Sequence, residues 1–229
     1  MSIPAAMSKL WSRLAHSRRD PVVARAAPFL LFIVLVMLAS QLQSPWIVVM
    51  RAPVIALLLV WFWAGYGELR APLPTPAHGS LAAIAGFVVF LIWIGVDQDW
   101  AVFSRTPGFA AALPDGRTDW IWGLARLAGF ALVVPVMEEL FWRSLVLRWI
   151  ERHEFLSVSP RSVGLRALVI TTALFALEHE RWFAGVAAGL VYAGVYMRSG
   201  SLWTPILAHA ITNASLGIWI LYTQNWQLW

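Results

Sequence analysis

The chain reads FLLFIVLVMLA from Phe29 to Ala39, and no charged residue occurs between Ala26 and Met50. As a helix that rises about 1.5 Å per residue, the charge-free stretch from Ala26 to Met50 is long enough to cross a bilayer core about 30 Å thick. The whole chain shares this character, because 60% of its 229 residues are hydrophobic and 13% are charged, about half the usual share in soluble domains. The composition excludes a water-soluble globule. It predicts an all-α, polytopic integral membrane bundle of about seven to eight transmembrane helices.

Two further features of the composition narrow the range of functions. The chain contains no Cys, which excludes disulfides, thiol catalysis and cysteine-based zinc sites. The net charge of +5 does not indicate a nucleic-acid partner, because the basic residues of the first 27 positions directly precede an apolar run, as topology signals do. We therefore predict a basic cytoplasmic segment over residues 1–27 and a single transmembrane bundle over residues 28–229. The basic residues of that segment are Lys9, Arg13, Arg18, Arg19 and Arg25.

The apolar segments predict seven crossings and therefore termini on opposite sides of the membrane. With the N-terminus in the cytoplasm, the acidic 97–119 loop lies outside and the arginine-rich 143–166 region lies inside, in agreement with the positive-inside rule. Small residues recur every four positions in the sixth segment and predict close helix packing there. They are Gly185, Gly189 and Ala193. The first of the seven segments is centred on residues 29–39. The other six cover residues 46–66, 80–96, 120–152, 165–177, 182–197 and 202–222.

Ionisable residues inside the fourth segment form the first candidate functional motif. Glu139 and Arg143 are four residues apart, so they share one helix face in the favourable acid-first order, while Glu138 points elsewhere. On the surface of a soluble protein such a pair would be an ordinary ion pair. Within an apolar span, ionisable groups usually face the bundle interior or a water-filled cavity and mark function.

Two His residues in later segments complete the candidate site. Phe175 and His179 are four residues apart at the end of the fifth segment, and a lone His there is also compatible with a structural role. His209 and Asn213 are four residues apart in a charge-free span, where such a pair can also hold helices together. The helical rise places Glu138, both His residues and Asn213 between about 10 and 20 Å from the cytoplasmic face.

This residue set suits two chemistries. A carboxylate and a His hold and deprotonate a water, while a second His and an Asn donate hydrogen bonds to a developing oxyanion. Alternatively, Glu138, His179 and His209 bind zinc with water as the fourth ligand. The chain has neither His-Glu-x-x-His nor Gly-x-Ser-x-Gly, so the zincin and serine-hydrolase templates are not met.

The three motifs, in this order on successive spans, resemble the CAAX protease and bacteriocin-processing (CPBP, ABI) family of intramembrane proteases. The resemblance covers a catalytic core of about residues 120–222. The surrounding VPVMEELFWR and YMRSGSLWTP are similar to a bacterial subgroup of CAAX prenyl protease-related proteins associated with exosortase and C-terminal sorting signals. One departure is Ser144, where many members carry Gly after the motif Arg.

The resemblance implies a role for each site residue. Glu138 is the base that activates water and His179 helps to hold that water, while His209 and Asn213 form the oxyanion site. Three further residues shape the pocket, namely Glu139, Arg143 and Phe175. No cofactor is implied, with zinc on Glu138, His179 and His209 as the alternative.

The expected function is an intramembrane glutamic-type endopeptidase of the bacterial inner membrane. Its substrate is a hydrophobic or lipid-modified C-terminus of a membrane-anchored or sorting-tagged protein, and its partners are this substrate and the lipid bilayer. The alternative is a non-catalytic membrane protein that binds hydrophobic peptide in bacteriocin immunity or scaffolding. Arg51 and Arg126 are unassigned, because they either line a route to the site or snorkel toward the membrane surface.

Overall fold

The computed structural model describes residues 18–105, 108–111 and 117–229, and across these ranges it is helical without a β-strand. The predicted all-α fold is thus confirmed. Residues 1–17 of the predicted basic cytoplasmic segment lie outside the described residues. The α-helices are α2 (Pro21–Leu42), α3 (Pro45–Trp61), α4 (Pro76–Gly95), α5 (Trp120–Ala128), α6 (Val134–Glu139), α7 (Leu147–Trp149), α8 (Leu165–Leu177), α9 (Trp182–Ser199) and α10 (Trp203–Thr223).

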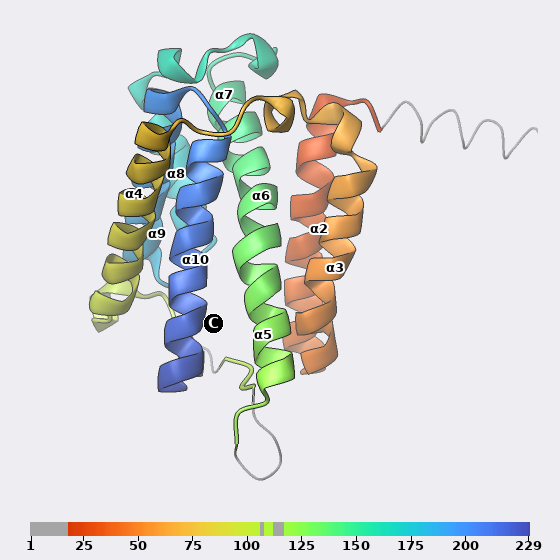
Figure 1. Ribbon diagram of the computed structural model, residues 1–229, viewed down its shortest axis with the longest axis vertical. Coiled ribbons are helices and arrows are strands. Elements are labelled where there is room, and N and C mark those ends of the chain that lie inside the picture. Colours follow the sequence, from red (N-terminus) through yellow and green to blue (C-terminus); the bar gives the residue numbers. More distant parts are fainter. Residues whose placement is uncertain (1–17, 106–107, 112–116) are drawn as a thin grey trace, which may run out of the picture.

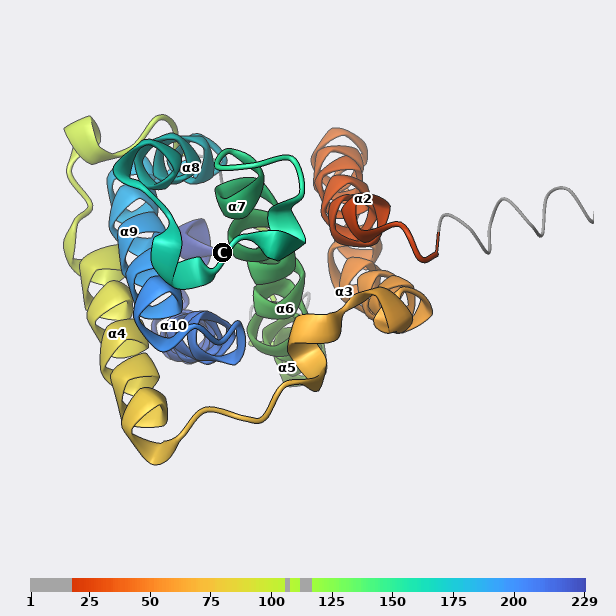
Figure 2. The ribbon, with the colours of Figure 1, turned by 90° about the horizontal axis from the view of Figure 1, so that it is seen from above.

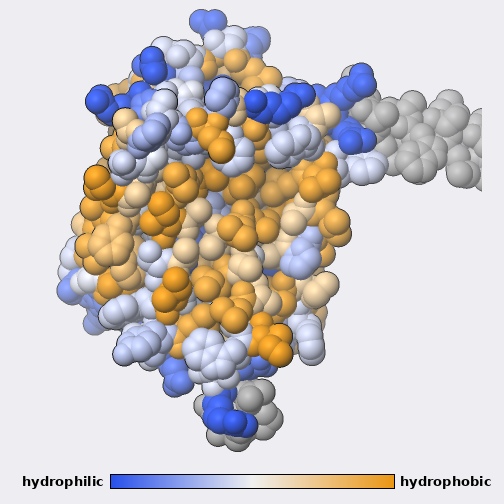
Figure 3. Space-filling view, in the orientation of Figure 1, coloured by the Kyte–Doolittle hydropathy of each residue, from blue (hydrophilic) through white to orange (hydrophobic). Residues whose placement is uncertain are grey.

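Successive helical rods run up and down the long axis of the molecule (Figure 1). Among the described residues, four rods are long and apolar enough to cross a membrane, namely α2, α4, the continuous Trp120–Trp149 rod and α10. The helices α3 and α8 are apolar but shorter. The visible face carries a broad hydrophobic band, with hydrophilic residues gathered at the two ends (Figure 3). The chain is therefore a multi-pass membrane bundle, while the number of crossings stays a prediction.

The α2–α3 hairpin stands beside the other helices and meets them through the central Trp120–Trp149 rod (Figure 2). On the far side of this rod, α4 packs against α10 and α8 packs against α9. Glycines make both contacts close. A Cβ on Gly86 of α4 would collide with the Ala208 carbonyl of α10, and a Cβ on Gly189 of α9 would lie 3.1 Å from Thr172 of α8. The predicted close packing of the sixth segment is confirmed.

Two helix boundaries differ from the sequence prediction. Pro76, predicted to lie in a loop, is the first residue of α4, where its fixed φ suits a helix start and the Thr75 hydroxyl accepts a hydrogen bond from the His78 N–H. The second segment, predicted to end at residue 66, ends earlier in the structure. The helix α3 stops at Trp61, and the chain continues as a 3₁₀ turn over Trp63–Gly65.

The central rod departs from α-helical geometry on both sides of the Glu138–Glu139 motif. Two π-helical stretches, η4 (Gly129–Val133) and η5 (Leu140–Val146), flank α6. Pro135 lies at the start of α6 and has no N–H for an intrahelical bond, which gives a physical cause for the first stretch. Insertions of this kind rotate the side chains that follow them and occur frequently at functional sites.

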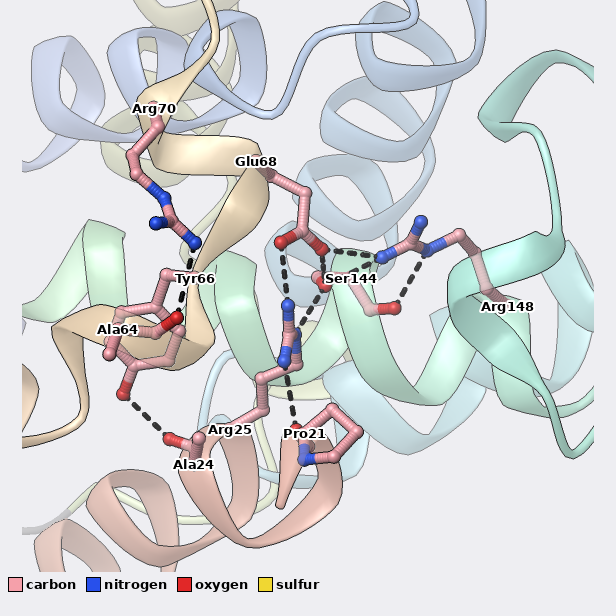
Figure 4. Close-up of polar contacts among 9 residues, drawn as sticks. All are labelled: Pro21, Ala24, Arg25, Ala64, Tyr66, Glu68, Arg70, Ser144 and Arg148. Atoms are coloured by element: carbon pink, nitrogen blue, oxygen red, sulfur yellow. Dashed lines mark hydrogen bonds and ion pairs between the residues drawn. The ribbon is translucent and has the colours of Figure 1, made fainter. Parts of the chain in front are cut away.

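A buried polar cluster ties the hairpin to the rod (Figure 4). Arg25 lies on α2, which begins at Pro21, and its guanidinium is 2.6 Å from Glu68. Glu68 also pairs with Arg148 of α7 at 2.7 Å and accepts a hydrogen bond from Ser144. Arg25 therefore belongs to the folded bundle, although its position in the sequence suggests a flanking topology charge.

Candidate active site

A cavity of about 560 Å³ lies between the α2–α3 hairpin and the helices on the other side of the central rod. The helical rise predicts only that four candidate residues lie at similar depth. In the structure these residues, Glu138, His179, His209 and Asn213, all border this one cavity, as does Phe175. Three separate helical elements thus bring them together from positions up to 75 residues apart in the chain.

Glu138 lies on α6 with 4% of its surface exposed. Its Oε2 is 4.0 Å from Nε2 of His209. That oxygen has no hydrogen-bond partner within the described part of the chain. A buried carboxylate oxygen without a partner is costly, so its orientation toward a cavity indicates a place for a bound water or substrate group.

Glu139, the next residue of α6, contacts two charged or polar neighbours. Its Oε2 is 3.2 Å from Nε of Arg143, as the four-residue spacing predicts, and its Oε1 is 2.9 Å from Nδ1 of His209. A carboxylate beside Nδ1 keeps a proton on that nitrogen. The contact therefore fixes the imidazole ring and turns Nε2 toward Glu138.

Aromatic rings complete the surroundings of His209 and Arg143. The Arg143 guanidinium lies 4.5 Å from the Phe175 ring centre and 5.3 Å from that of Tyr192, which also stacks on His209 at 4.8 Å. The Tyr192 hydroxyl donates to Thr212 at 2.7 Å. Sequence reasoning missed Tyr192 and Thr212. The available signal was a hydroxyl in each of two apolar helices, since buried hydroxyls require partners.

His179 follows α8 in the turn that leads to α9, and its Nδ1 lies 2.8 Å from the Phe175 carbonyl oxygen. When Nδ1 donates to this carbonyl, a neutral ring keeps Nε2 as an acceptor. The edge of the Trp93 ring contacts the imidazole, with ring centres 5.4 Å apart. The four-residue spacing of Phe175 and His179 thus corresponds to a direct backbone contact.

Asn213 is on α10, one turn beyond His209, and is 5% exposed. Its Nδ2 donates to the Phe130 carbonyl oxygen in the first π-helical stretch at 2.8 Å. This bond uses one of the two amide hydrogens, so the second hydrogen and the side-chain oxygen can interact with a group in the cavity.

Glu178 contributes another cavity carboxylate that lies outside the predicted site. Trp142 of the central rod donates its indole N–H to Glu178 Oε2 at 3.0 Å. The bond joins the rod to the end of α8, next to His179. Glu178 is not among the residues singled out from the sequence.

The donor set does not form an assembled metal centre. Among the described residues, no three His, Asp or Glu side chains are arranged to hold a metal ion. The predicted zinc ligands instead make other contacts, since His179 meets a backbone carbonyl and His209 meets Glu139. The metal dependence of the reaction is a matter for chelation experiments.

Comparison with known families bears on the part of the chain that holds these residues. Residues 120–215 match the family model described as type II CAAX prenyl endopeptidase Rce1-like. This stretch is a CAAX protease family domain. It contains every predicted site residue, and the match supports a membrane-embedded peptidase that acts on a membrane-associated protein. Searches of curated proteins and of solved structures gave no match.

The cavity of the CAAX protease domain extends beyond the matched residues. The helices α2 and α3 supply part of its wall, and the C-terminal turn η8 (Trp226–Leu228) borders it as well. The access route and the binding surface are thus built partly from segments outside the family model. Wall residues from α2 and α3 include Phe32, Ile33, Val36, Ala39, Val48 and Arg51.

Proposed function

We propose that the protein is an intramembrane endopeptidase that uses Glu138 to activate water. One observation carries this proposal, namely the unpartnered Oε2 of Glu138 in the cavity wall, 4.0 Å from His209 within a CAAX protease domain. A buried carboxylate that faces both a cavity and an imidazole is suited to accept a proton from water.

In the proposed reaction, a water lies between Glu138 and the substrate carbonyl, with His179 Nε2 accepting one of its hydrogen bonds. Glu138 removes a proton while the water oxygen bonds to the carbonyl carbon, and the carbonyl π electrons move to the oxygen. The tetrahedral oxyanion accepts hydrogen bonds from Asn213 Nδ2 and His209 Nε2. Glu138 then returns the proton to the leaving nitrogen as the C–N bond breaks.

The role of His209 requires a proton on both ring nitrogens, because Nδ1 faces Glu139 while Nε2 donates to the oxyanion. The carboxylate of Glu139, 2.9 Å away, offsets the charge of that imidazolium. Arg143, 3.2 Å from the other carboxylate oxygen, helps to orient Glu139. Glu139 and Arg143 thus act as positioning residues, and Phe175 limits the movement of the guanidinium.

The proposed substrate is a hydrophobic or lipid-modified C-terminus of a membrane-anchored or sorting-tagged protein. The apolar wall contributed by α2 supports this choice, because it can receive a chain that remains within the bilayer. The proposed location is the bacterial inner membrane, with the N-terminus in the cytoplasm. We further propose that the reaction needs no cofactor.

The test compares protein termini in membranes from cells that carry wild type, Glu138→Gln or the control Glu154→Gln, whose carboxylate is exposed in the loop before α8. We expect a small set of new C-terminal fragments in wild type and control, and a loss of at least about 10³-fold in Glu138→Gln. Mass spectrometry identifies these fragments and the cleavage sites.

Two outcomes contradict parts of the proposal. Identical termini in all three strains, with equal amounts of inserted protein, favour a binding or scaffolding protein. Cleavage by the purified enzyme that a chelator abolishes and zinc restores favours the metal-dependent alternative.

A further inference from the structure

Two arginines in the cavity wall lack an acidic partner among residues 18–105, 108–111 and 117–229. Arg126 on α5 is 6% exposed, and its Nη1 donates to the Phe109 carbonyl oxygen at 2.8 Å. Its Nε is buried without a hydrogen-bond partner. Arg51 on α3 has its guanidinium carbon 5.1 Å from the centre of the Phe32 ring. Both side chains border the same cavity as Glu138.

The other arginines at this end of the cavity have acidic partners. Arg105 pairs with Asp97 at 2.7 Å and with Asp99 at 3.1 Å, and Arg181 pairs with Asp97 at 2.8 Å. The carboxylates of the 97–99 region are therefore engaged already. Arg51 and Arg126 also share the wall of a second, very small cavity, which places two like charges in one part of the molecule.

Their positions do not fit simple snorkelling. A snorkelling side chain keeps its charged head in water, whereas Arg126 is almost fully buried. The rings of Trp122 and Trp229 lie 5.3 and 4.4 Å from its guanidinium carbon and enclose it. Arg126 is buried and Arg51 is half-buried, and neither has an acidic partner in the described part of the chain. Two neighbouring like charges of this kind are unfavourable, and an anionic ligand in the cavity would offset both.

We propose that Arg51 and Arg126 bind the free α-carboxylate at the C-terminus of the peptide held in this cavity, an inference that rests on the proposed protease function. Guanidinium groups suit this ligand, because their planar donors match a carboxylate in a bidentate arrangement. The same cavity supplies the Glu138 carboxylate further along the central rod. One peptide can therefore contact both places.

The spacing of the two places sets the length of the released fragment. Arg126 and Glu138 are 12 residues apart on one continuous rod, a separation of at most about 18 Å at the α-helical rise, because a π-helical stretch between them is wound more tightly along the axis. An extended peptide covers about 3.3–3.6 Å per residue, so about five residues fit between the anchored carboxylate and the cleaved bond. We expect the enzyme to release C-terminal peptides of about this length.

The test measures binding and does not depend on cleavage. The probes are two peptides, acetyl-Ala-Val-Leu-Ile-Val with a free carboxylate and the same peptide with a C-terminal amide. The full chain with Glu138→Gln, in phosphatidylcholine nanodiscs, should bind the acid at least about 10-fold more tightly than the amide. The added pair Arg51→Gln and Arg126→Gln should abolish this preference. The control pair Arg152→Gln and Arg166→Gln removes the same charge from exposed positions and should keep it.

The single variants still test the proposal if the double variant does not fold. Arg51→Gln and Arg126→Gln alone should each reduce the acid preference at least about threefold. Equal binding of acid and amide by the protein with both arginines overturns the proposal. Phosphatidylglycerol that displaces the acid, and that copurifies less with the double variant, assigns the site to a lipid phosphate and also overturns it. None of these results bears on cleavage at Glu138.

Discussion

At the residue scale, His209 shows how one side chain acquires its role from four neighbours. Glu139 contacts one ring nitrogen, Tyr192 covers the ring face, Glu138 lies opposite the other nitrogen, and Asn213 follows one turn later on the same helix. A His alone on an apolar helix face is compatible with many roles. Here the carboxylate beside Nδ1 determines the orientation of the ring and so which nitrogen can face a substrate.

The proposed oxyanion role of Asn213 gives a prediction at this scale. Asn213→Ala removes the amide donor and should lower kcat by about 10²–10³-fold, with little change in KM, because the bond forms mainly in the transition state. Cleavage of a peptide identified from the membrane fragments would be measured with purified protein. Asn225→Ala, at an exposed position beyond α10, is the matched control. A fall in affinity without a fall in kcat would assign Asn213 to substrate binding instead.

At the scale of elements, the molecule depends on close helix contacts and on the altered winding of the central rod. The α4–α10 pair is the most extensive helix contact, and Gly86 permits it because no Cβ separates α4 from the Ala208 carbonyl. This pair also positions the site, since Thr212 of α10 bonds to the Gly86 carbonyl at 2.7 Å and to Tyr192. Helix packing and the environment of His209 are therefore linked.

The Gly86 contact can be tested by adding one carbon. Gly86→Ala should destabilise the protein by about 1–3 kcal/mol, because the methyl group overlaps backbone that cannot move away easily. Gly194→Ala, on the exposed side of α9 where a Cβ meets no atom within 4 Å, should be neutral or slightly stabilising. Thermal unfolding in detergent compares the two variants with wild type. Equal midpoints for both would show that α4 and α10 can separate at little cost.

At the scale of the whole molecule, the Glu68 cluster joins the α2–α3 hairpin, the turn after it and the end of the central rod (Figure 4). The hairpin supplies part of the cavity wall, so this attachment helps to hold that wall in place. Burial acts to raise the pKa of Glu68, but the Arg25 guanidinium, the Ser144 hydroxyl and Arg148 outweigh it and lower that pKa below its usual value. The carboxylate is thus held in its charged form.

The lowered pKa of Glu68 predicts an acid-sensitive attachment. A carboxyl group whose pKa falls on folding stabilises the protein above its usual pKa of about 4.3 and loses that contribution as the pH drops through the lowered value. Glu68→Gln should therefore cost about 3 kcal/mol at neutral pH and flatten the decline of the unfolding midpoint in acid. Glu154→Gln, at an exposed position, should behave like wild type. If the unfolding midpoint of Glu68→Gln declined in acid as steeply as that of wild type, the Glu68 cluster would not be the source of the acid sensitivity.

Topology is a second property of the whole molecule, and the absence of Cys makes it measurable. The arrangement of charges predicts that residue 98 faces the outside and residue 157 faces the cytoplasm. Gln98→Cys should react with an impermeant maleimide in intact cells, whereas Ser157→Cys should react only after the membrane is opened. Both positions are exposed. The reverse pattern would place the basic N-terminal region outside.

The sequence by itself determined the fold class, the approximate helices and five residues that border one cavity in the structure, namely Glu138, Phe175, His179, His209 and Asn213. Apolar runs dictate membrane helices because lipid cannot satisfy exposed backbone groups. Spacings of four residues place side chains on one helix face, which predicted the Glu139–Arg143 pair and the close packing of α9. Pro76 was misassigned because proline favours both loops and helix starts, and only the capping hydrogen bond distinguishes them.

Only the tertiary structure decided which residues meet across helices. The helical rise gives the height of Glu138, His179, His209 and Asn213, but their common cavity depends on how each helix is rotated about its own axis. The π-helical turns and Pro135 alter that rotation in the central rod. Such long-range packing also brings Glu139 to His209, stacks Tyr192 on that ring and places Arg51 and Arg126 at the same cavity. A repeating local pattern does not encode these arrangements.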